Sequence, residues 1–309
     1  MARPFRFGVS AYLAENGADW ATKAREMEEM GYSTLVVADH FGRGLAPIPA
    51  MAAAAAATEE LRVGSFVLDN DFRHPAVVAK EISTLDVLSD GRVELGIGAG
   101  WRVEDYTETG IPFDPPGVRV SRLEEALTII KGLWTEEKFS FSGHHYQIDG
   151  LQNLPKPVQS PHPPIFIGGG GKRILGIAGR EANIVGMLAK TKADGSGVDD
   201  ADVTEEGLGR RLRVLRDAAG PRFTDLELNL LVQFVRITED IEGEAKKIGD
   251  EWEMSTEDIL GIPEGFIGSE DQIVEKIHRL RDEFGISYFT VFGDAYESFA
   301  PIVGELAGK

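Results

Sequence analysis

Short apolar runs alternate with longer amphipathic stretches along the whole chain. Eight of the runs are rich in Val, Ile, Leu and Phe, which is typical of strands buried on both faces of a parallel sheet. These runs cover residues 5–9, 34–37, 61–67, 93–97, 165–167, 183–187, 226–232 and 287–292. The pattern therefore predicts strands that alternate with helices.

The stretches between these runs have helical spacing. Residues 75–88 show it clearly, because Val78, Ile82 and Leu85 fall on one face of a helix. The other predicted helices cover residues 19–30, 47–58, 121–134, 172–180, 204–219, 242–251, 269–284 and 295–306. Such alternation predicts an α/β fold.

Eight strands in alternation with helices favour a (β/α)8 TIM barrel that occupies residues 1–309 as a single domain. An open doubly wound sheet is the alternative, but the G-x-G-x-x-G turn expected after its first strand is absent. Three segments interrupt the alternation, near residues 136–164, 188–204 and 252–268. The first contains "KFSFSGHHYQI", which predicts a small hairpin. Binding loops and plain surface insertions fit the first two segments equally well, and the last two are expected to border the substrate chamber.

Charge and composition exclude several classes of partner. The 32 Lys and Arg residues against 51 Asp and Glu residues give a net charge of −19. Nucleic acid and an anionic membrane surface are therefore disfavoured as partners. The chain has no Cys, which excludes disulfides and thiolate sites. No secretory signal, membrane span or metal-ligand spacing is visible, so we expect a cytoplasmic protein without a metal.

The active site of a barrel lies at the carboxyl ends of its strands. After the second predicted strand comes "VVADHF", in which Asp39 and His40 offer a proton-transfer group beside a charge. A helix cap next to a surface imidazole is an equally good interpretation. After the third strand, "LDNDFRHPA" places several polar residues in one loop, either as a pocket wall or, for Asp71 or His74, as the cap of the next helix.

Glycines follow the fourth predicted strand in "LGIGAGW". Gly96, Gly98 and Gly100 alternate, which would leave one side of the backbone bare for a flat ring. Trp101 would then close over that ring. The alternative is a barrel wall thinned by glycine, with Trp101 in the core.

A run of four glycines follows the fifth predicted strand in "PPIFIGGGG", at Gly168, Gly169, Gly170 and Gly171. The run opens a predicted helix, so its N–H groups would gather at one place. That arrangement predicts a phosphate cradle that needs no charged side chain. A flexible turn is the alternative. A phosphate cradle and one acid/base pair suggest a phosphorylated flat cofactor that carries the chemistry itself.

The motifs "VVADHF", "GIGAGW", "RLEEALTIIKGLW", "FSFSGHHYQI", "PPIFIGGGG" and "GSEDQIVEKI" occur in this order. Together they resemble the bacterial luciferase-like superfamily, and within it the deazaflavin-dependent oxidoreductases that use coenzyme F420. The resemblance extends from about residue 5 to residue 292. It implies a luciferase-like barrel, often a homodimer, with a cofactor ring in the barrel mouth and its phosphate on the four glycines.

The resemblance also implies roles for single residues. His40 would donate or accept a proton beside the reactive edge of the ring, and Asp39 would orient it. A non-prolyl cis peptide bond is expected between Phe66 and Val67, bulging against the ring. The implied cofactor contacts are Asp39, Phe66, Val67, Asp69, Gly98, Ala99, Gly100, Gly168, Gly169, Gly170 and Gly171.

One position departs from the family pattern. Sugar-phosphate dehydrogenases of the family carry Glu directly after the glycines of the fourth strand, where this chain has Trp101. We therefore expect a more apolar substrate site, bordered by Trp101 and Phe41. The predicted function is F420-dependent hydride transfer to or from a small organic substrate. The alternatives are an FMNH2-dependent monooxygenase and a barrel that binds a cofactor without catalysis.

Overall fold

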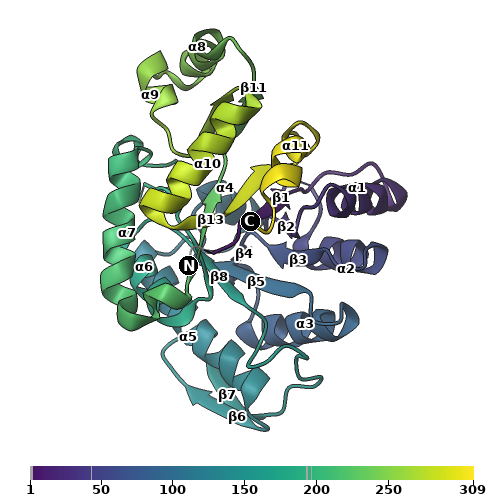
Figure 1. The fold of residues 1–309 in the computed structure, drawn as a ribbon. Helices are drawn as coiled ribbons and strands as arrows, with labels where there is room; N and C mark the ends of the chain where they lie inside the picture. Colours follow the sequence, from purple (N-terminus) through teal and green to yellow (C-terminus); the bar gives the residue numbers. More distant parts are fainter. Residues whose placement is uncertain (1–2, 43, 193, 196) are drawn as a thin grey trace.

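A computed structural model describes residues 3–42, 44–192, 194–195 and 197–309. Eight parallel strands form a closed barrel, because β3 pairs with β5 as well as with β2 (Figure 1). The barrel strands, in spatial order, are β1 (Arg6–Ser10), β2 (Thr34–Val37), β3 (Arg62–Ser65), β5 (Val93–Gly98), β8 (Ile165–Gly168), β9 (Ile184–Gly186), β10 (Glu227–Leu231) and β13 (Ile286–Phe292). All eight predicted strands are confirmed, and so is the TIM-barrel fold.

The predicted helices are also present. They are α1 (Gly17–Glu29), α2 (Pro47–Ala57), α3 (Pro75–Leu88), α5 (Pro116–Thr135), α6 (Lys172–Glu181), α7 (Glu205–Ala219), α8 (Ile241–Trp252), α10 (Glu270–Phe284) and α11 (Tyr296–Leu306). Their apolar faces and the outward side chains of the strands form the main hydrophobic core. Burial of this apolar surface is the main force that holds the barrel closed.

A second, smaller core fills the interior of the barrel. Phe166, Ile184 and Tyr288 meet there from three different strands. Two glycines make room for the rings, since a Cβ on Gly8 would lie 2.8 Å from the Tyr288 hydroxyl and one on Gly186 would lie 2.6 Å from the Phe166 ring. The interior is therefore packed with side chains below the mouth, as in other barrels of this size.

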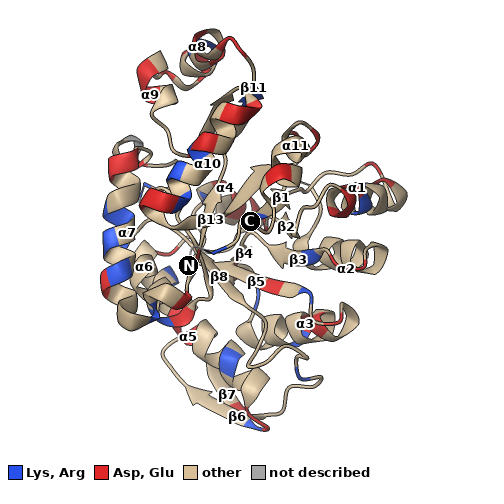
Figure 2. Cartoon of the chain, viewed as in Figure 1, with Lys and Arg blue, Asp and Glu red and all other residues tan. Residues whose placement is uncertain are grey.

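Charged residues are concentrated on the outer helices (Figure 2). An exception lies inside the barrel, where the Glu94 carboxylate is 2.9 Å from an Arg6 nitrogen and 2.7 Å from Arg62 Nε. Burial disfavours the charged carboxylate, but the two guanidinium groups outweigh burial and lower the pKa of Glu94. This cluster joins β1, β3 and β5 and is structural.

Two segments extend the barrel. The hairpin of β6 (Phe139–Ser142) and β7 (Gln147–Leu151) lies between α5 and β8. A larger unit lies between β10 and α10 and contains β11 (Phe234–Ile237), α8, α9 (Thr256–Leu260) and β12 (Gly265–Gly268). It has its own small core, formed by Phe234, Ala245, Ile248, Ile259 and Ile262. Helices α8 and α9 stand away from the barrel (Figure 1), and this unit begins well before the expected residues 252–268.

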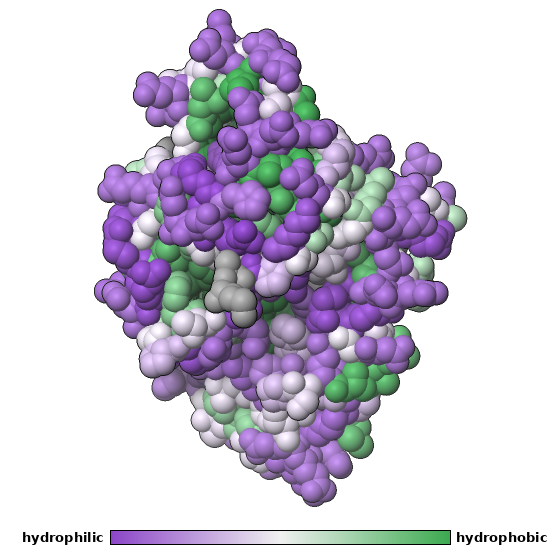
Figure 3. Space-filling model, in the orientation of Figure 1, coloured by the Kyte–Doolittle hydropathy of each residue, from purple (hydrophilic) through white to green (hydrophobic). Residues whose placement is uncertain are grey.

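The third expected insertion, residues 188–204, connects β9 to α7. Ala193 and Ser196 within it lie outside the described residues. The visible face of the protein is mostly hydrophilic with separate apolar patches (Figure 3). Among the described residues, no helix is both long and apolar enough to cross a membrane.

Candidate active site

Most of the predicted site residues lie on one side of the barrel mouth. Strands β2, β3, β5 and β8 are neighbours in the barrel, and their carboxyl ends meet at the same rim. The loop after β2 carries Asp39, His40 and Phe41, and the loop after β3 carries Phe66 and Val67. The end of β5 leads to Trp101, and the four glycines lie at the end of β8. The structure thus brings together residues that are far apart in the sequence.

His40 is held by a carboxylate that the sequence analysis did not identify. Its Nδ1 lies 2.6 Å from Oδ2 of Asp105, which is almost fully buried. Asp39 instead binds Arg73, with Nη1–Oδ2 and Nη2–Oδ1 distances of 2.5 Å and 3.1 Å. The expectation that Asp39 orients His40 is therefore wrong, because the Asp39 carboxylate is directed at the guanidinium of Arg73.

Asp105 lies on α4 (Val103–Thr109), a short helix that the sequence pattern did not predict. Seven residues are too few for a clear apolar periodicity. The next residue, Tyr106, donates a hydrogen bond of 2.7 Å from its hydroxyl to Asp69. Adjacent side chains of one helix thus hold the loop after β2 and the strand β4 (Leu68–Asp69).

Asp69 is a buried carboxyl group at the rim. Burial raises its pKa to about 7, and the nearby charges of Asp71 and Asp39 act in the same direction. Hydrogen bonds from the Asp71 N–H and the Tyr106 hydroxyl oppose this rise in pKa. Asp69 can therefore hold or release a proton near neutral pH.

The other polar residues of this loop are engaged within the protein. Both oxygens of Asp71 bind the guanidinium of Arg122, at 2.9 Å and 2.7 Å. His74 caps α3, since its Nδ1 accepts the N–H of Ala76. For His74 the capping interpretation is confirmed, and Asp71 is an ion-pair partner.

The peptide bond between Phe66 and Val67 is cis, as expected. The Phe66 ring packs on Phe166 with 5.0 Å between ring centroids. A Cβ on Gly98 would lie 2.9 Å from the Val67 side chain. The alternating glycines were predicted to leave open space for a cofactor ring. That prediction is wrong for the space where their Cβ atoms would lie, because other residues of the protein already fill it.

The same holds for the two flanking glycines. A Cβ on Gly96 would collide with the carbonyl of Ser65, and one on Gly100 would collide with Tyr106 and Asp69. These glycines therefore permit the close approach of β3, β4 and α4. Contacts of Gly98, Ala99 and Gly100 with a cofactor remain a prediction.

The four-glycine run forms an open cradle at the amino end of α6. Gly169 has φ +148°, which favours glycine, and Gly170 lies against the backbone of residues 188–190. Gly171 is the N-cap of α6, and no side chain caps this helix. A Cβ on Gly171 would meet no atom within 4 Å. The Gly169 N–H donates to the Gly186 carbonyl at 3.2 Å, so the N–H groups that fit a phosphate are those of Gly170, Gly171 and the first turn of α6.

Two aromatic side chains stand exposed at the rim. Trp101 is 42% exposed and meets the His40 ring edge-on, with 5.9 Å between centroids. The alternative in which Trp101 belongs to the core is therefore wrong. Phe41 is 44% exposed and packs on Phe72 at 4.9 Å. Both give the mouth beside His40 an apolar border.

The opposite side of the mouth contains a buried ion pair that sequence reasoning missed. Arg211 donates to the carbonyl of Met187 at the end of β9 and to carboxylates of Asp202 and Glu264. Burial raises the pKa of Glu264 to about 7, although Arg211 opposes this. The cluster joins α7 to the loop after β9 and to the unit between β10 and α10.

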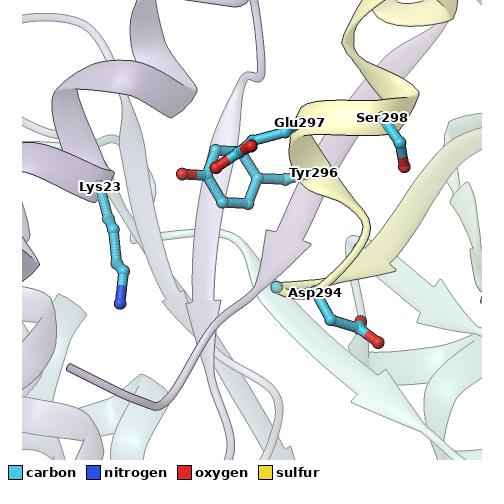
Figure 4. A pocket seen from close by; sticks show the side chains of 6 residues that line it. Lys23, Asp294, Tyr296, Glu297 and Ser298 are labelled. Carbon is cyan, nitrogen blue, oxygen red and sulfur yellow. The ribbon is translucent and has the colours of Figure 1, made fainter.

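A surface hollow of about 630 Å³ lies between α1 and the start of α11 (Figure 4). It is lined by Lys23, Asp294, Tyr296, Glu297 and Ser298, together with Gly293, and contains none of the predicted site residues. Lys23 and Tyr296 already bind partners within the chain, Asp19 and Glu26. We therefore place the candidate active site at the rim around His40 and not in this hollow. Among the described residues, no group of acidic or histidine side chains could hold a metal ion.

The closed parallel barrel and the cis bond after β3 are the features that the resemblance to the luciferase-like class of oxidoreductases predicts. Residues 3–207 match the family described as luciferase-like monooxygenase, and the chain belongs to this family. Membership agrees with the resemblance of the sequence motifs.

Relatives of known activity differ in cofactor. The chain is 35% identical over 194 residues to an F420-dependent glucose-6-phosphate dehydrogenase of Microbacterium testaceum. This match covers 59% of this chain and 56% of that protein. It is 29% identical over 285 residues to an FMNH2-dependent dimethylsulfone monooxygenase of Pseudomonas putida. This match covers 81% of this chain and 76% of that protein. The first match thus spans only about half of the relative.

Solved structures show the same fold. A coenzyme F420-dependent tetrahydromethanopterin reductase from Methanopyrus kandleri superimposes with a TM-score of 0.78, covering 98% of each chain at 17% identity. At this identity the similarity concerns the fold alone. The relatives support a flavin- or deazaflavin-dependent oxidoreductase.

Proposed function

We propose that the protein is an F420-dependent oxidoreductase that moves a hydride to or from a small organic substrate. The observation that carries this proposal is the position of His40 at the rim. Its Nδ1 lies 2.6 Å from Asp105 Oδ2, and the His40 side chain is 23% exposed, so Nε2 is the nitrogen left to face a substrate. A proton-transfer group with one nitrogen fixed and the other available suits such a reaction.

The residues present fit a phosphorylated flat cofactor. The N–H groups of Gly170, Gly171 and the first turn of α6 would hold its phosphate, and the cis bulge at Phe66–Val67 would support its ring. When bound, a deazaflavin supplies a ring carbon that accepts or gives up a hydride. Asp69 and the backbone from Gly98 to Gly100 complete the proposed cofactor contacts.

His40 would handle the proton that accompanies hydride transfer. In the oxidation of an alcohol, Nε2 takes the hydroxyl proton while the carbinol carbon gives up its hydride, and the C–O single bond becomes a carbonyl. In the reverse direction, the protonated ring returns a proton to the carbonyl oxygen. Trp101 and Phe41 would border the substrate and keep water from the reacting atoms.

An FMNH2-dependent monooxygenase is the second candidate. It is favoured by the longer match to the Pseudomonas putida monooxygenase, which covers 81% of this chain. The phosphate cradle does not distinguish the two cofactors, because both present a phosphate to the same N–H groups. The protein's net charge of −19 opposes the anionic tail of F420, and Arg173 is already bound to Glu124 on α5.

Titration of the protein with each cofactor tests the proposal. We expect F420 to bind and to be turned over, and His40→Ala to abolish turnover with little change in cofactor affinity. His144→Ala is the matched control, because His144 is exposed in the hairpin loop. Tight binding of FMN without binding of F420 would favour the monooxygenase. Turnover retained by His40→Ala would refute the assigned role.

We also propose that the protein forms a homodimer, on the basis of the resemblance. Exposed apolar side chains suited to an interface occur on and beside α3, at Val87, Leu88, Leu154 and Val158. Light scattering of Leu88→Asp against the wild-type protein tests this surface. A monomeric wild-type protein would exclude the dimer.

A further inference from the structure

Asp105 has a distinct partner for each of its two carboxylate oxygens. Oδ2 lies 2.6 Å from Nδ1 of His40, and Oδ1 accepts the backbone N–H of Phe41 at 3.1 Å. The residue is only 2% exposed. The guanidinium of Arg102 lies 3.7 Å from Oδ1, within ion-pair distance. One side chain thus fixes both the His40 ring and the backbone that follows it.

An ionised carboxylate can only accept hydrogen bonds. The ring nitrogen that faces Oδ2 must therefore carry a hydrogen. In the neutral imidazole only one nitrogen is protonated, so a proton on Nδ1 leaves the Nε2 lone pair free. The neutral ring would then present an acceptor, and not a donor, to the mouth of the barrel.

We propose that Asp105 is a positioning residue that fixes neutral His40 as the Nδ1-protonated tautomer. Its importance for turnover rests on the proposed function, whereas the tautomer itself does not. Asp105 acts through His40 and has no contact with the reacting atoms in this assignment. The proposal adds a residue 65 positions away in the sequence to the site.

The helix that carries Asp105 is well anchored. Tyr106 binds Asp69 at 2.7 Å, and the hydroxyl of Thr109 donates to the carbonyl of Asp105 at 2.6 Å. Gly110 ends α4 in the left-handed conformation, with φ +74°. These contacts hold the carboxylate in place before any ligand binds, which is how a positioning residue limits reorganisation.

Substitution by Asn separates the tautomer from the packing. Asp105→Asn keeps the shape of the side chain but replaces one acceptor oxygen with an NH2 group. Only one oxygen then remains to accept from the Phe41 N–H or from His40 Nδ1. If that oxygen accepts the Phe41 N–H, the amide nitrogen faces Nδ1 and can only donate to it. The ring proton must then move to Nε2. The opposite amide orientation would place two N–H donors against each other at Phe41.

Nitrogen-15 NMR of the cofactor-free protein reads the tautomer directly. The chain has six His residues, and the signals of His40 are those that disappear in His40→Gln. Spectra are recorded at the alkaline end of the titration, where the ring is neutral. We expect the wild-type ring to be protonated at Nδ1, and the Asp105→Asn ring at Nε2. Glu104→Gln is the matched control, since this neighbour on α4 is exposed and does not touch His40.

Wild-type His40 protonated at Nε2 would overturn the proposal, and so would a folded Asp105→Asn protein with the wild-type tautomer. If Asp105→Asn does not fold, the wild-type spectrum alone decides. Once a substrate is known, Asp105→Asn should lower kcat by about 10²–10⁴-fold with cofactor affinity unchanged. Failure of F420 to bind would refute the proposed function, but it would leave the NMR result standing.

Discussion

The carboxylate of Asp39 and the guanidinium of Arg73 form a two-point ion pair at the barrel rim, with N–O distances of 2.5 Å and 3.1 Å. Asp39 also accepts the N–H of Asp69 at 3.0 Å. The pair therefore joins the loop after β2 to the segment after β3. It neutralises one carboxylate in a part of the mouth that also contains Asp69 and Asp71.

Replacement of Arg73 should destabilise the protein. Asp39 is 9% exposed, and Arg73→Met would leave its charge with only one hydrogen bond. Removal of one member of a buried pair is costly, but the Arg73 side chain is 22% exposed, so water can replace part of the interaction. We expect a loss of about 1–3 kcal/mol in the free energy of unfolding, measured by urea denaturation.

A surface pair provides the control. Arg180 binds Glu124 with side chains that are 53% and 37% exposed, so Arg180→Met should cost less than about 1 kcal/mol. Asp39→Asn combined with Arg73→Met should recover part of the loss, because the unpaired charge is gone. Equal costs for Arg73→Met and Arg180→Met would show that the rim pair contributes no more than a surface pair.

The pH dependence of stability should contain a contribution from Asp69. Burial raises its pKa to about 7 from an ordinary value of 3.8. The folded state therefore binds this proton more tightly than the unfolded state, and Asp69 lowers stability as the pH rises from about 4 to about 7. Above this range its full destabilising effect is present, and below it the effect is absent.

Asp69→Asn should remove this contribution. The Asn carbonyl can still accept the Asp71 N–H, and the Tyr106 hydroxyl can turn to Asp71, which is 3.4 Å away. Relative to the wild type, the variant should gain a few kcal/mol between pH 4 and pH 8 in urea unfolding. A difference between the two proteins that does not change with pH would contradict the raised pKa.

The barrel could be predicted because its strands are buried on both faces. Such strands appear in the sequence as apolar runs, and all eight were found. Some short elements outside the barrel were not predicted. Helix α4 has seven residues and β12 has four, which is too short for periodicity to separate them from loops. Helix α8 was predicted, but the short elements β11, α9 and β12 around it were not, so the extent of this unit was underestimated.

The candidate site residues were expected at strand ends, and the structure places most of them on one side of the rim, but their pairing was not foreseen. His40, the cis bond and the glycine cradle follow from strand ends and family motifs. Asp105 lies 65 residues from His40, and only the three-dimensional structure brings them together. The neighbour in sequence, Asp39, was the natural partner to expect. Its side chain instead reaches Arg73, 34 positions away.

The last two glycines of the cradle should respond differently to substitution by Ala. A Cβ on Gly170 would lie 2.5 Å from the Lys190 nitrogen and 2.6 Å from the Leu188 carbonyl oxygen, so Gly170→Ala requires the backbone to move. A Cβ on Gly171 would meet no atom within 4 Å, and its φ of −71° suits Ala. Gly171→Ala should therefore fold normally but weaken the binding of a phosphorylated cofactor.

Thermal unfolding and cofactor titration distinguish the two effects. We expect Gly170→Ala to lower the Tm and Gly171→Ala to leave the Tm within a few degrees of the wild type. The affinity of Gly171→Ala for the cofactor should fall about tenfold or more, because the methyl group occupies the phosphate site. A stable Gly171→Ala protein with wild-type affinity would place the phosphate elsewhere.

Trp101 should affect substrate preference more than stability. The side chain is 42% exposed, so Trp101→Ala removes the contacts of a half-buried ring and should cost about 1–3 kcal/mol in the free energy of unfolding. If Trp101 covers the substrate, each methylene group added to an alcohol substrate should raise kcat/KM by up to about fourfold in the wild type, since a fully buried CH2 contributes about 0.8 kcal/mol. Trp101→Ala should flatten this dependence on chain length.

Trp252→Ala is the control for this prediction, because Trp252 is 41% exposed but lies on α8, in the unit between β10 and α10. It should leave the dependence of kcat/KM on chain length unchanged. The same flattening in both variants would indicate a general effect on the protein. Unchanged chain-length dependence in Trp101→Ala would mean that the alkyl chain lies away from Trp101, and the apolar border beside His40 would then serve the cofactor ring rather than the substrate.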